Sequence, residues 1–223
     1  MIYLFDEKAG AQQLLIRGEN FKYLIKVRRH SVGDQLAFRN KANIAILYHY
    51  KITAVEPRSV TLVLIKEEIL EVKAKKSLHI GWCVIDNKSV EKVLASLNEI
   101  GVEQISFIYC ERSQKNFKPD LKRYERILDA SNQQCGRSVV MRFNIYKSVE
   151  DFITAYPQTK VFDFTEKTLA CENDFETVLI GCEGGFSPTE KVFLQNQEVF
   201  RLDTPMVLRS ESAVVAVASK III

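Results

Sequence analysis

Residues 180–190, which read IGCEGGFSPTE, place two adjacent glycines between an apolar run and the start of a helix. Ser187 is a suitable N-cap, Pro188 suits the first helical position, and Glu190 completes a capping box. The preceding residues TVLI have the composition of a strand. The segment therefore predicts a strand, a glycine loop and a helix in succession. In open α/β sheets ligands bind at the carboxyl ends of strands, and glycines let a ligand approach the backbone.

Three kinds of ligand compete for this loop, and a purely structural tight turn is the alternative to all of them. A Walker A loop requires a Lys after the glycines, which is absent, so a nucleoside triphosphate is disfavoured. A dinucleotide fingerprint requires GxGxxG, which residues 181–186 do not match, although Asp203 ends the next expected strand where a ribose-binding acid would fall. The third ligand is an adenosyl group held by backbone contacts without phosphate.

From residue 78 onward, strand-like runs alternate with helix-like runs. Gly101 follows one of the helical runs and suits its C-terminal stop, since glycine adopts the left-handed conformation. Alternation of this kind indicates an α/β fold with a mostly parallel sheet. We expect strands at residues 78–85, 104–110, 139–146, 160–164, 177–181 and 198–202, and helices at 88–100, 119–135, 148–156, 187–196 and from about 211.

The first 70 residues have a different texture, with short β-branched and aromatic runs separated by turn signals. One helix-like piece, residues 19–29, interrupts them. This pattern predicts a small barrel or sheet domain. The charged segment 66–77 has no periodicity, and we expect it to be a linker. The strand-like runs are residues 2–5, 12–17, 34–39, 43–55 and 59–65.

The composition is that of an ordinary soluble globular protein, with 47% hydrophobic and 26% charged residues among 223. The five cysteines are dispersed and form no CxxC pair, which predicts reduced thiols and a cytoplasmic location. The three histidines lack metal-ligand spacing, so we expect no metal site. No apolar run approaches the length of a membrane span, and the N-terminus lacks a signal-peptide pattern. We therefore expect no membrane association.

Basic residues are unevenly distributed along the chain. Residues 1–75 carry 13 basic and 8 acidic residues, and the stretch 22–29 is basic without any acid. A second basic zone, residues 111–142, carries 8 basic and 4 acidic residues. Two such zones in a nearly neutral protein favour a polyanionic partner. Ordinary solvated surface is the alternative for either zone taken alone.

A second segment near the C-terminus, LDTPMVLRSESA at residues 202–213, holds Arg209 and Glu211 just ahead of an Ala/Val-rich helix. An Arg and a Glu at such a junction are costly to bury without partners. They form either a catalytic pair beside the glycine loop or a mutual ion pair or helix cap.

With these motifs together, the sequence resembles the RsmE family of the SPOUT superfamily. LIGCEGGFSPTE (179–190) followed by LDTPMVLRSESAVVA (202–216) resembles the family's paired C-terminal motifs. Further similar stretches are NEIGVEQISFIYCERS (98–113), SNQQCGRS (131–138) and KVRRHSVGDQLAF (26–38), so the resemblance covers nearly the whole chain. Four positions depart from the family pattern: Cys182 stands for Pro, Gln133 for Glu, Tyr23 for His and Ile100 for Leu.

The resemblance implies an S-adenosylmethionine-dependent methyltransferase that methylates N3 of one uridine in small-subunit (16S) ribosomal RNA. It implies a PUA-like β-barrel RNA-binding domain at residues 1–70 and a SPOUT domain with a C-terminal trefoil knot at 71–223. It also implies a homodimer with the knot region at the interface. Val214, Val215 and Val217 serve either that interface or the core of the monomer.

The resemblance also assigns candidate residues. Arg209 would stabilise negative charge on the uracil, and Glu211 would accept the N3 proton or hold Arg209 in place. Residues expected to bind the cofactor are Gly181, Glu183, Gly184, Gly185, Phe186, Leu202, Pro205, Val207 and Leu208. From the two basic zones, rather than from the resemblance, we expect RNA contacts by Lys22, Lys26, Arg28, Arg29, Arg112, Gln134 and Arg137, with ordinary surface charge as the alternative.

Three other functions stay open at the level of the sequence. One is a SPOUT-type methyltransferase acting on another RNA. The second is a non-catalytic RNA-binding protein of ribosome assembly, and the third is a dinucleotide-dependent oxidoreductase built on residues 181–203.

Overall fold

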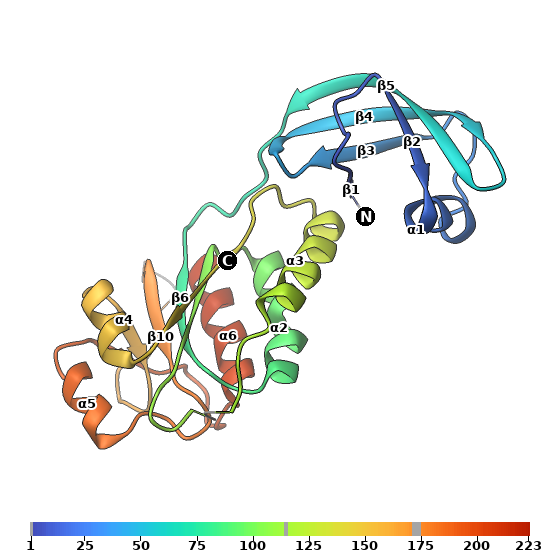
Figure 1. Cartoon of the computed structure of the whole chain (residues 1–223). Helices are drawn as coiled ribbons and strands as arrows, with labels where there is room; N and C mark the ends of the chain where they lie inside the picture. The colour runs from blue at the N-terminus through green and yellow to red at the C-terminus, as the bar shows by residue number, and fades with distance from the viewer. Residues whose placement is uncertain (1, 114–115, 171–174) are drawn as a thin grey trace. The chain divides into compact units, whose positions relative to one another are not determined.

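The computed structural model of the chain describes residues 2–113, 116–170 and 175–223. It divides into two compact units (Figure 1). The first unit comprises the residues up to Lys73 together with Asn132–Val139, and the second comprises Ala74–Ser131 together with Val140–Ile223. Residues 132–139 thus group with the first unit, although they lie far along the sequence. The expected division into domains 1–70 and 71–223, as bodies that fold on their own, stays a prediction.

The first unit contains a five-stranded sheet that curls into a half-barrel, in the order β1-β3-β4-β5-β2. All five strands fall where the sequence predicts them. Their outer pair β1–β3 is parallel, and the other pairs are antiparallel. The inner face packs Leu24, Phe38, Tyr50 and Ile52, all fully buried. The strands are β1 (Leu4–Phe5), β2 (Gln13–Arg17), β3 (Gln35–Asn40), β4 (Asn43–Val55) and β5 (Ser59–Ile69).

One local expectation for this unit is wrong in part. The charged segment from residue 66 is not all linker, because β5 continues to Ile69 against the long strand β4. There the Glu68 carboxylate lies 2.8 Å from His49 Nε2 and 2.7 Å from Lys66 Nζ, so pairing along and across the strands keeps the charged residues extended. The expected helix-like piece at 19–29 is helical, in two parts: α1 (Gly18–Phe21) passes into a π-helix, η1 (Lys22–Val27).

The second unit contains a six-stranded sheet in the order β11-β9-β10-β6-β7-β8, in which the neighbouring strands of the described residues are parallel. This confirms the expected α/β class. The strands are β6 (His79–Cys83), β7 (Gln104–Ile108), β8 (Arg142–Tyr146), β9 (Lys160–Phe162), β10 (Thr177–Ile180) and β11 (Val199–Phe200). The helices are α2 (Asn87–Ile100), α3 (Leu121–Cys135), α4 (Val149–Ala155), α5 (Pro188–Leu194) and α6 (Ser210–Ile222).

Local signals explain where the helices begin and end. Asp86 caps α2 by accepting a hydrogen bond from the Ser89 amide at 3.0 Å, and Gly101 ends that helix in the left-handed conformation at φ 112°. At α5, Ser187 and Glu190 form the predicted capping box. The helices flank the sheet, with α2 and α6 side by side on one face and α4 and α5 on the other (Figure 1).

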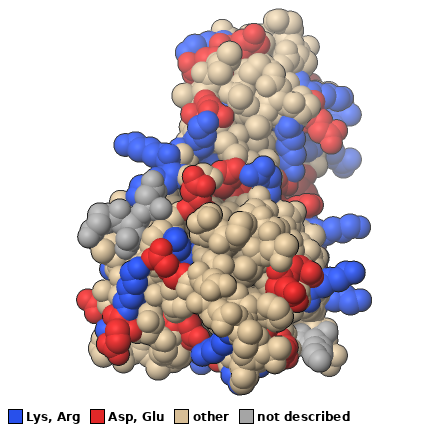
Figure 2. All heavy atoms as spheres, turned by 90° about the vertical axis from the view of Figure 1, so that its left-hand side faces the viewer, with Lys and Arg blue, Asp and Glu red and all other residues tan. Residues whose placement is uncertain are grey.

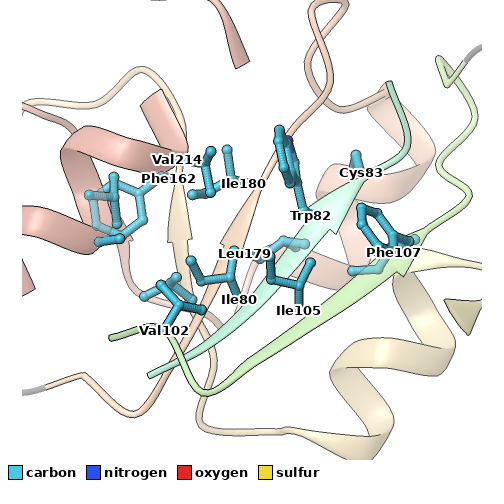
Figure 3. Close-up of a cluster of buried hydrophobic side chains, with 14 of the residues drawn as sticks. Ile80, Trp82, Cys83, Val102, Ile105, Phe107, Phe162, Leu179, Ile180 and Val214 are labelled. Atoms are coloured by element: carbon cyan, nitrogen blue, oxygen red, sulfur yellow. The ribbon is translucent and has the colours of Figure 1, made fainter. Parts of the chain in front are cut away.

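The core of this unit lies between the sheet and its helices. Figure 3 shows apolar side chains of β6, β7, β9 and β10 packed together with Val214 of α6. Val214 and Val217 are fully buried in this core, whereas Val215 is half-buried against it. The monomer core therefore accounts for the two buried valines. The expected trefoil knot and the interface role of this helix stay predictions. No helix in the described part of the chain is long and apolar enough to cross a membrane.

Candidate functional site

A pocket of about 230 Å³ opens at the carboxyl edge of the parallel sheet, beside the glycine loop. Its walls come from four places: the end of β9, the loop after β10, the segment after β11, and the first turns of α6. Parallel neighbours β9 and β10 end at the same edge, so the loops that follow them meet there. Residues of the second motif, namely Leu202, Thr204 and Met206 to Leu208, form another part of the wall. The pocket thus joins the two motifs that the sequence singles out.

Seven of the nine predicted cofactor-binding residues line this pocket. They are Gly181, Glu183, Gly185, Phe186, Leu202, Val207 and Leu208. Gly184 and Pro205 are not part of the lining. Gly184 instead packs against the Arg112 side chain, where an added Cβ would lie 3.2 Å from Arg112 Cβ.

Sequence reasoning missed two other parts of the wall. The residues Phe162, Asp163 and Phe164 come from the end of β9, and Ser210 and Ala213 come from α6. The sequence does signal the first group, because it predicts a strand at 160–164, and the end of a parallel strand lies at an edge of the sheet. Its position beside β10 depends on strand order, which the sequence does not reveal. In the sequence, Ser210 has no feature beyond that of a common residue at a helix start, so nothing indicates its place in the pocket wall.

Hydrogen bonds fix the shape of the glycine loop. Gly185 has φ +63°, a conformation that costs little only for glycine, and its amide donates to the Cys182 carbonyl at 2.9 Å. The Ser210 hydroxyl donates to the Gly181 carbonyl at 2.7 Å, and Arg112 Nη1 donates to the Gly184 carbonyl at 2.7 Å. Carbonyls of the loop are therefore paired within the protein. Among the described residues, the amides of Glu183 and Phe186 donate no hydrogen bond, so they are available to a ligand.

The buried carboxylate of Glu190 ties the start of α5 to the turn after β7. Its Oε2 accepts from the Ser187 amide at 2.8 Å, and its Oε1 accepts from the Glu111 amide at 2.9 Å. A carboxylate buried to 5% exposure is tolerated because both oxygens are hydrogen-bonded. The turn that carries Arg112 is thereby held against the glycine loop from two points.

Arg209 and Glu211 flank Ser210 at the start of α6. Arg209 is exposed, and its guanidinium makes no ion pair or hydrogen bond with another described residue. Glu211 is 8% exposed, and its Oε2 is buried without a hydrogen-bond partner. The expected alternative of a mutual ion pair is therefore not formed in the described structure. Neither residue lines the pocket itself, and both adjoin a residue that does.

Three thiols cluster behind the glycine loop. Cys110 Sγ lies 3.5 Å from Cys182 Sγ and 3.0 Å from the Ser113 hydroxyl. The Cys182 thiol is hydrogen-bonded to Cys110 and buried, and both effects raise its pKa. A hydrogen bond with Cys110 and burial likewise raise the pKa of the Cys83 thiol. Within the described residues, no group of three or more His, Cys, Asp or Glu side chains has the arrangement of a metal site.

The residues predicted to bind RNA are placed unequally. In the first unit Lys26, Arg28 and Arg29 are exposed, while Lys22 is paired with Glu19 at 2.7 Å. Gln134 is exposed, whereas Arg137 is buried to 5% exposure and so offers little side-chain surface to a partner. On the face drawn in Figure 2, the basic and acidic side chains of the described residues are interspersed.

Known proteins include relatives of this chain that are similar in sequence over nearly its whole length. Residues 72–222 match a family described as an RNA methyltransferase domain. A Helicobacter pylori protein named ribosomal RNA small subunit methyltransferase E is 38% identical over 223 residues, covering 98% of this chain and 98% of that protein. A protein of the same name from Aquifex aeolicus is 25% identical over 229 residues, covering 98% of each chain.

Solved structures share the fold over nearly the whole chain. One is a putative methyltransferase from Legionella pneumophila in complex with the cofactor SAM, at a TM-score of 0.77 and 21% identity, covering 99% of this chain and 95% of that one. Another is a ribosomal RNA small subunit methyltransferase E from Neisseria gonorrhoeae bound to S-adenosyl methionine, at a TM-score of 0.77 and 14% identity, covering 98% and 95%. At these identities the likeness establishes the fold.

Proposed function

The chain belongs to the family of ribosomal RNA small subunit methyltransferases E, the RsmE family, and from that premise we propose that it methylates N3 of a specific uridine in 16S ribosomal RNA. The methyl donor is S-adenosylmethionine. The observation that carries the proposal is the full-length 38% identity to a named family member, combined with a pocket formed by the two motifs of the resemblance.

The pocket suits this cofactor in shape and chemistry. Leu202, Val207 and Leu208 supply apolar surface for an adenine ring, and the free amides of the glycine loop supply donors for its polar atoms. Glu183 is an exposed carboxylate in the lining, where it favours the positive charges of the sulfonium and the amino group. No Lys of the Walker A kind follows the glycines, which fits a ligand without phosphates.

When bound, S-adenosylmethionine supplies an electrophilic methyl group. The N3 atom of uracil carries a proton and is a poor nucleophile until that proton leaves. Arg209 has an exposed guanidinium that makes no bond with another described residue, so it can contact the uracil oxygens that gain negative charge. Its place at the first residue before α6 puts it next to the pocket wall at Ser210.

Glu211 is the proposed proton acceptor. Its Oε2 is buried and has no hydrogen-bond partner among the described residues, which is unfavourable for the resting protein and is relieved when a donor arrives. The N3–H group of the substrate is such a donor, directly or through one water. Holding Arg209 in place is the other role for this carboxylate. Glu211→Gln separates the two, because Gln keeps an acceptor oxygen for Arg209 but cannot take up the proton.

The RNA must present an unstacked base to the pocket, so a paired uridine has to flip out. The exposed cations Lys26, Arg28 and Arg29 support phosphate contacts by the first unit. Exposed apolar side chains at Phe164, Met206 and Val207, beside the pocket, support a homodimer. A protein acting on ribosomal subunits works in the cytoplasm, which is the location we propose.

The test is to incubate the purified protein with S-adenosylmethionine and small subunits from a strain that lacks this activity. Digested RNA is then analysed by mass spectrometry for 3-methyluridine, with isomers methylated on other atoms as standards. The proposal expects 3-methyluridine at one site and none with the Arg209→Ala protein. A different methylated nucleoside, or methylation of transfer RNA alone, would overturn the substrate. Light scattering on the same sample tests the homodimer.

A further inference from the structure

A chain of two hydrogen bonds links the core to the glycine loop through Ser210. Trp82 on β6 is fully buried, and its Nε1 donates to the Ser210 hydroxyl at 2.8 Å. The Ser210 hydroxyl donates in turn to the Gly181 carbonyl at 2.7 Å. An indole N–H is only a donor, so the hydroxyl must accept from Trp82 and is left with its single proton for Gly181. The direction of both bonds is therefore fixed.

The elements joined in this way are those that the reaction must align. Gly181 is the first residue of the glycine loop, and Ser210 is the first residue of α6. Both lie in the pocket wall. Arg209, which is the N-cap of α6, and Glu211 make no side-chain hydrogen bond to the described residues that would fix the start of the helix. Within the described residues, the Ser210 hydroxyl provides the side-chain hydrogen bond between this helix start and the loop.

Trp82 is well placed to orient that hydroxyl. Trp82 lies directly opposite Ile180 in the ladder between β6 and β10, and Ile180 is the residue that precedes Gly181. Figure 3 shows its ring among the buried side chains of the sheet, next to Ile180. A large side chain with no exposed surface has one orientation in a packed core, so its N–H is a rigid reference point.

We infer that Ser210 is a positioning residue, oriented by Trp82, that couples the cofactor-binding glycine loop to the start of the helix carrying Arg209 and Glu211. The inference rests on the proposed function, since it concerns the same pocket. It assigns to Ser210 and Trp82 no contact with the reacting atoms. Loss of the hydroxyl leaves the Gly181 carbonyl and the Trp82 N–H without their partner, so both the loop and the helix start lose one restraint.

The experiment compares Ser210→Ala with Ser210→Thr, which keeps the hydroxyl, and with Trp82→Phe, which removes the orienting donor together with part of the buried ring. Affinity for S-adenosylmethionine is measured by calorimetry on the protein alone, and kcat is measured on ribosomal subunits. We expect Ser210→Ala to weaken binding and to lower kcat, each by about tenfold. Ser210→Thr should restore most of both, and Trp82→Phe should cost less than Ser210→Ala because the hydroxyl can still donate. Arg209→Ala should lower kcat without weakening cofactor binding.

Trp82 is the only tryptophan of the chain, so its fluorescence reports on the bond without any need for activity. Ser210→Ala should shift its emission, and cofactor binding should change the emission more in the parent protein than in Ser210→Ala. Unchanged affinity and kcat in Ser210→Ala would overturn the inference and leave the proposed function intact. Equal losses in Ser210→Ala and Ser210→Thr would overturn it as well. If the parent protein binds the cofactor but methylates no ribosomal RNA, the proposed function fails, and the affinity comparison still decides the role of Ser210.

Discussion

Arg112 Nη1 donates a 2.7 Å hydrogen bond to the Gly184 carbonyl, and its aliphatic stem packs against Gly184 Cα. A residue predicted to bind RNA is thus also a support of the glycine loop. Replacing Arg112 by Ala removes this bond, so we expect the affinity for S-adenosylmethionine to fall about five- to tenfold. Calorimetry on the protein alone measures this. Arg123→Ala is the matched control, because Arg123 is half-exposed and paired with Glu91 on α2. If Arg112→Ala leaves the cofactor affinity unchanged and weakens RNA binding, Arg112 serves RNA binding alone.

Gly185 gives a test of backbone conformation. Its φ of +63° is strained for other residues, yet nothing lies within 4 Å of an added Cβ. Gly185→Ala should therefore destabilise the protein without cofactor by about 1–2 kcal/mol, through strain rather than a clash. Gly185→Asn is the control, since Asn tolerates the left-handed region better. Urea unfolding measures both. If Gly185→Ala is as stable as the parent, the loop can change its backbone conformation at residue 185 without a cost in stability.

The affinities of Gly185→Ala and Gly185→Asn for the cofactor separate an effect of backbone conformation from a steric effect of the added side chain. If only the backbone matters, Asn binds the cofactor better than Ala. If the added side chain meets the ligand, the larger Asn binds it worse.

Acid should destabilise the second unit through His79. This side chain is 8% exposed and hydrogen-bonded to the Ser106 hydroxyl at 2.7 Å, and burial lowers its pKa from 6.5 to about 4, helped slightly by Arg142 and opposed by Glu103. Between pH 6.5 and pH 4 the unfolded chain binds a proton here that the folded chain does not. The free energy of unfolding should therefore fall as pH drops through this window, by at most about 3 kcal/mol.

His79→Gln tests this assignment, because Gln keeps a polar contact but does not titrate in the window. We expect the variant to be less stable than the parent at pH 7 and to lose less stability on acidification. Urea unfolding at several pH values measures both slopes. Parallel slopes would assign the acid sensitivity to other groups.

Strands, caps and the glycine loop were predictable because their signals are local. The capping box at Ser187 and Glu190 and the stop at Gly101 need only a few neighbouring residues. The continuation of β5 to Ile69 was not predictable, because the ladder with β4 outweighs the charged composition.

The pocket was predictable from the two motifs only in part. The contribution of β9 depends on strand order, and Ser210 matters through Trp82, which lies 128 residues away in the sequence. Arg137 shows the converse: a basic zone suggests exposure, whereas the tertiary structure buries this side chain.

Exposed cations of the first unit should control the salt dependence of RNA binding. Lys26, Arg28 and Arg29 are exposed, whereas Lys22 already has a partner in Glu19. The triple substitution of the first three by Ala should weaken RNA binding and reduce the slope of log affinity against log salt by about two. Fluorescence anisotropy with a labelled RNA fragment measures the slope.

The charge-matched control for that variant replaces Lys8, Lys41 and Lys51, which are exposed in the same unit, by Ala. Both triple variants should bind S-adenosylmethionine like the parent. Equal loss of RNA affinity in the two variants would show that net charge acts without a defined contact surface.

Cys182 should report cofactor binding through its reactivity. It lines the pocket and is buried, and its raised thiol pKa keeps little of it as the reactive thiolate. Labelling with iodoacetamide, followed by peptide mass spectrometry, should modify the exposed Cys135 first and Cys182 slowly. If the bound cofactor covers Cys182, labelling occurs only in the free protein, so a ligand at a hundred times its Kd slows it about a hundredfold. Cys135 serves as the internal control and should keep its rate. A Cys182 rate that does not change at saturating cofactor would show that the bound ligand does not cover this thiol, although Cys182 lines the pocket.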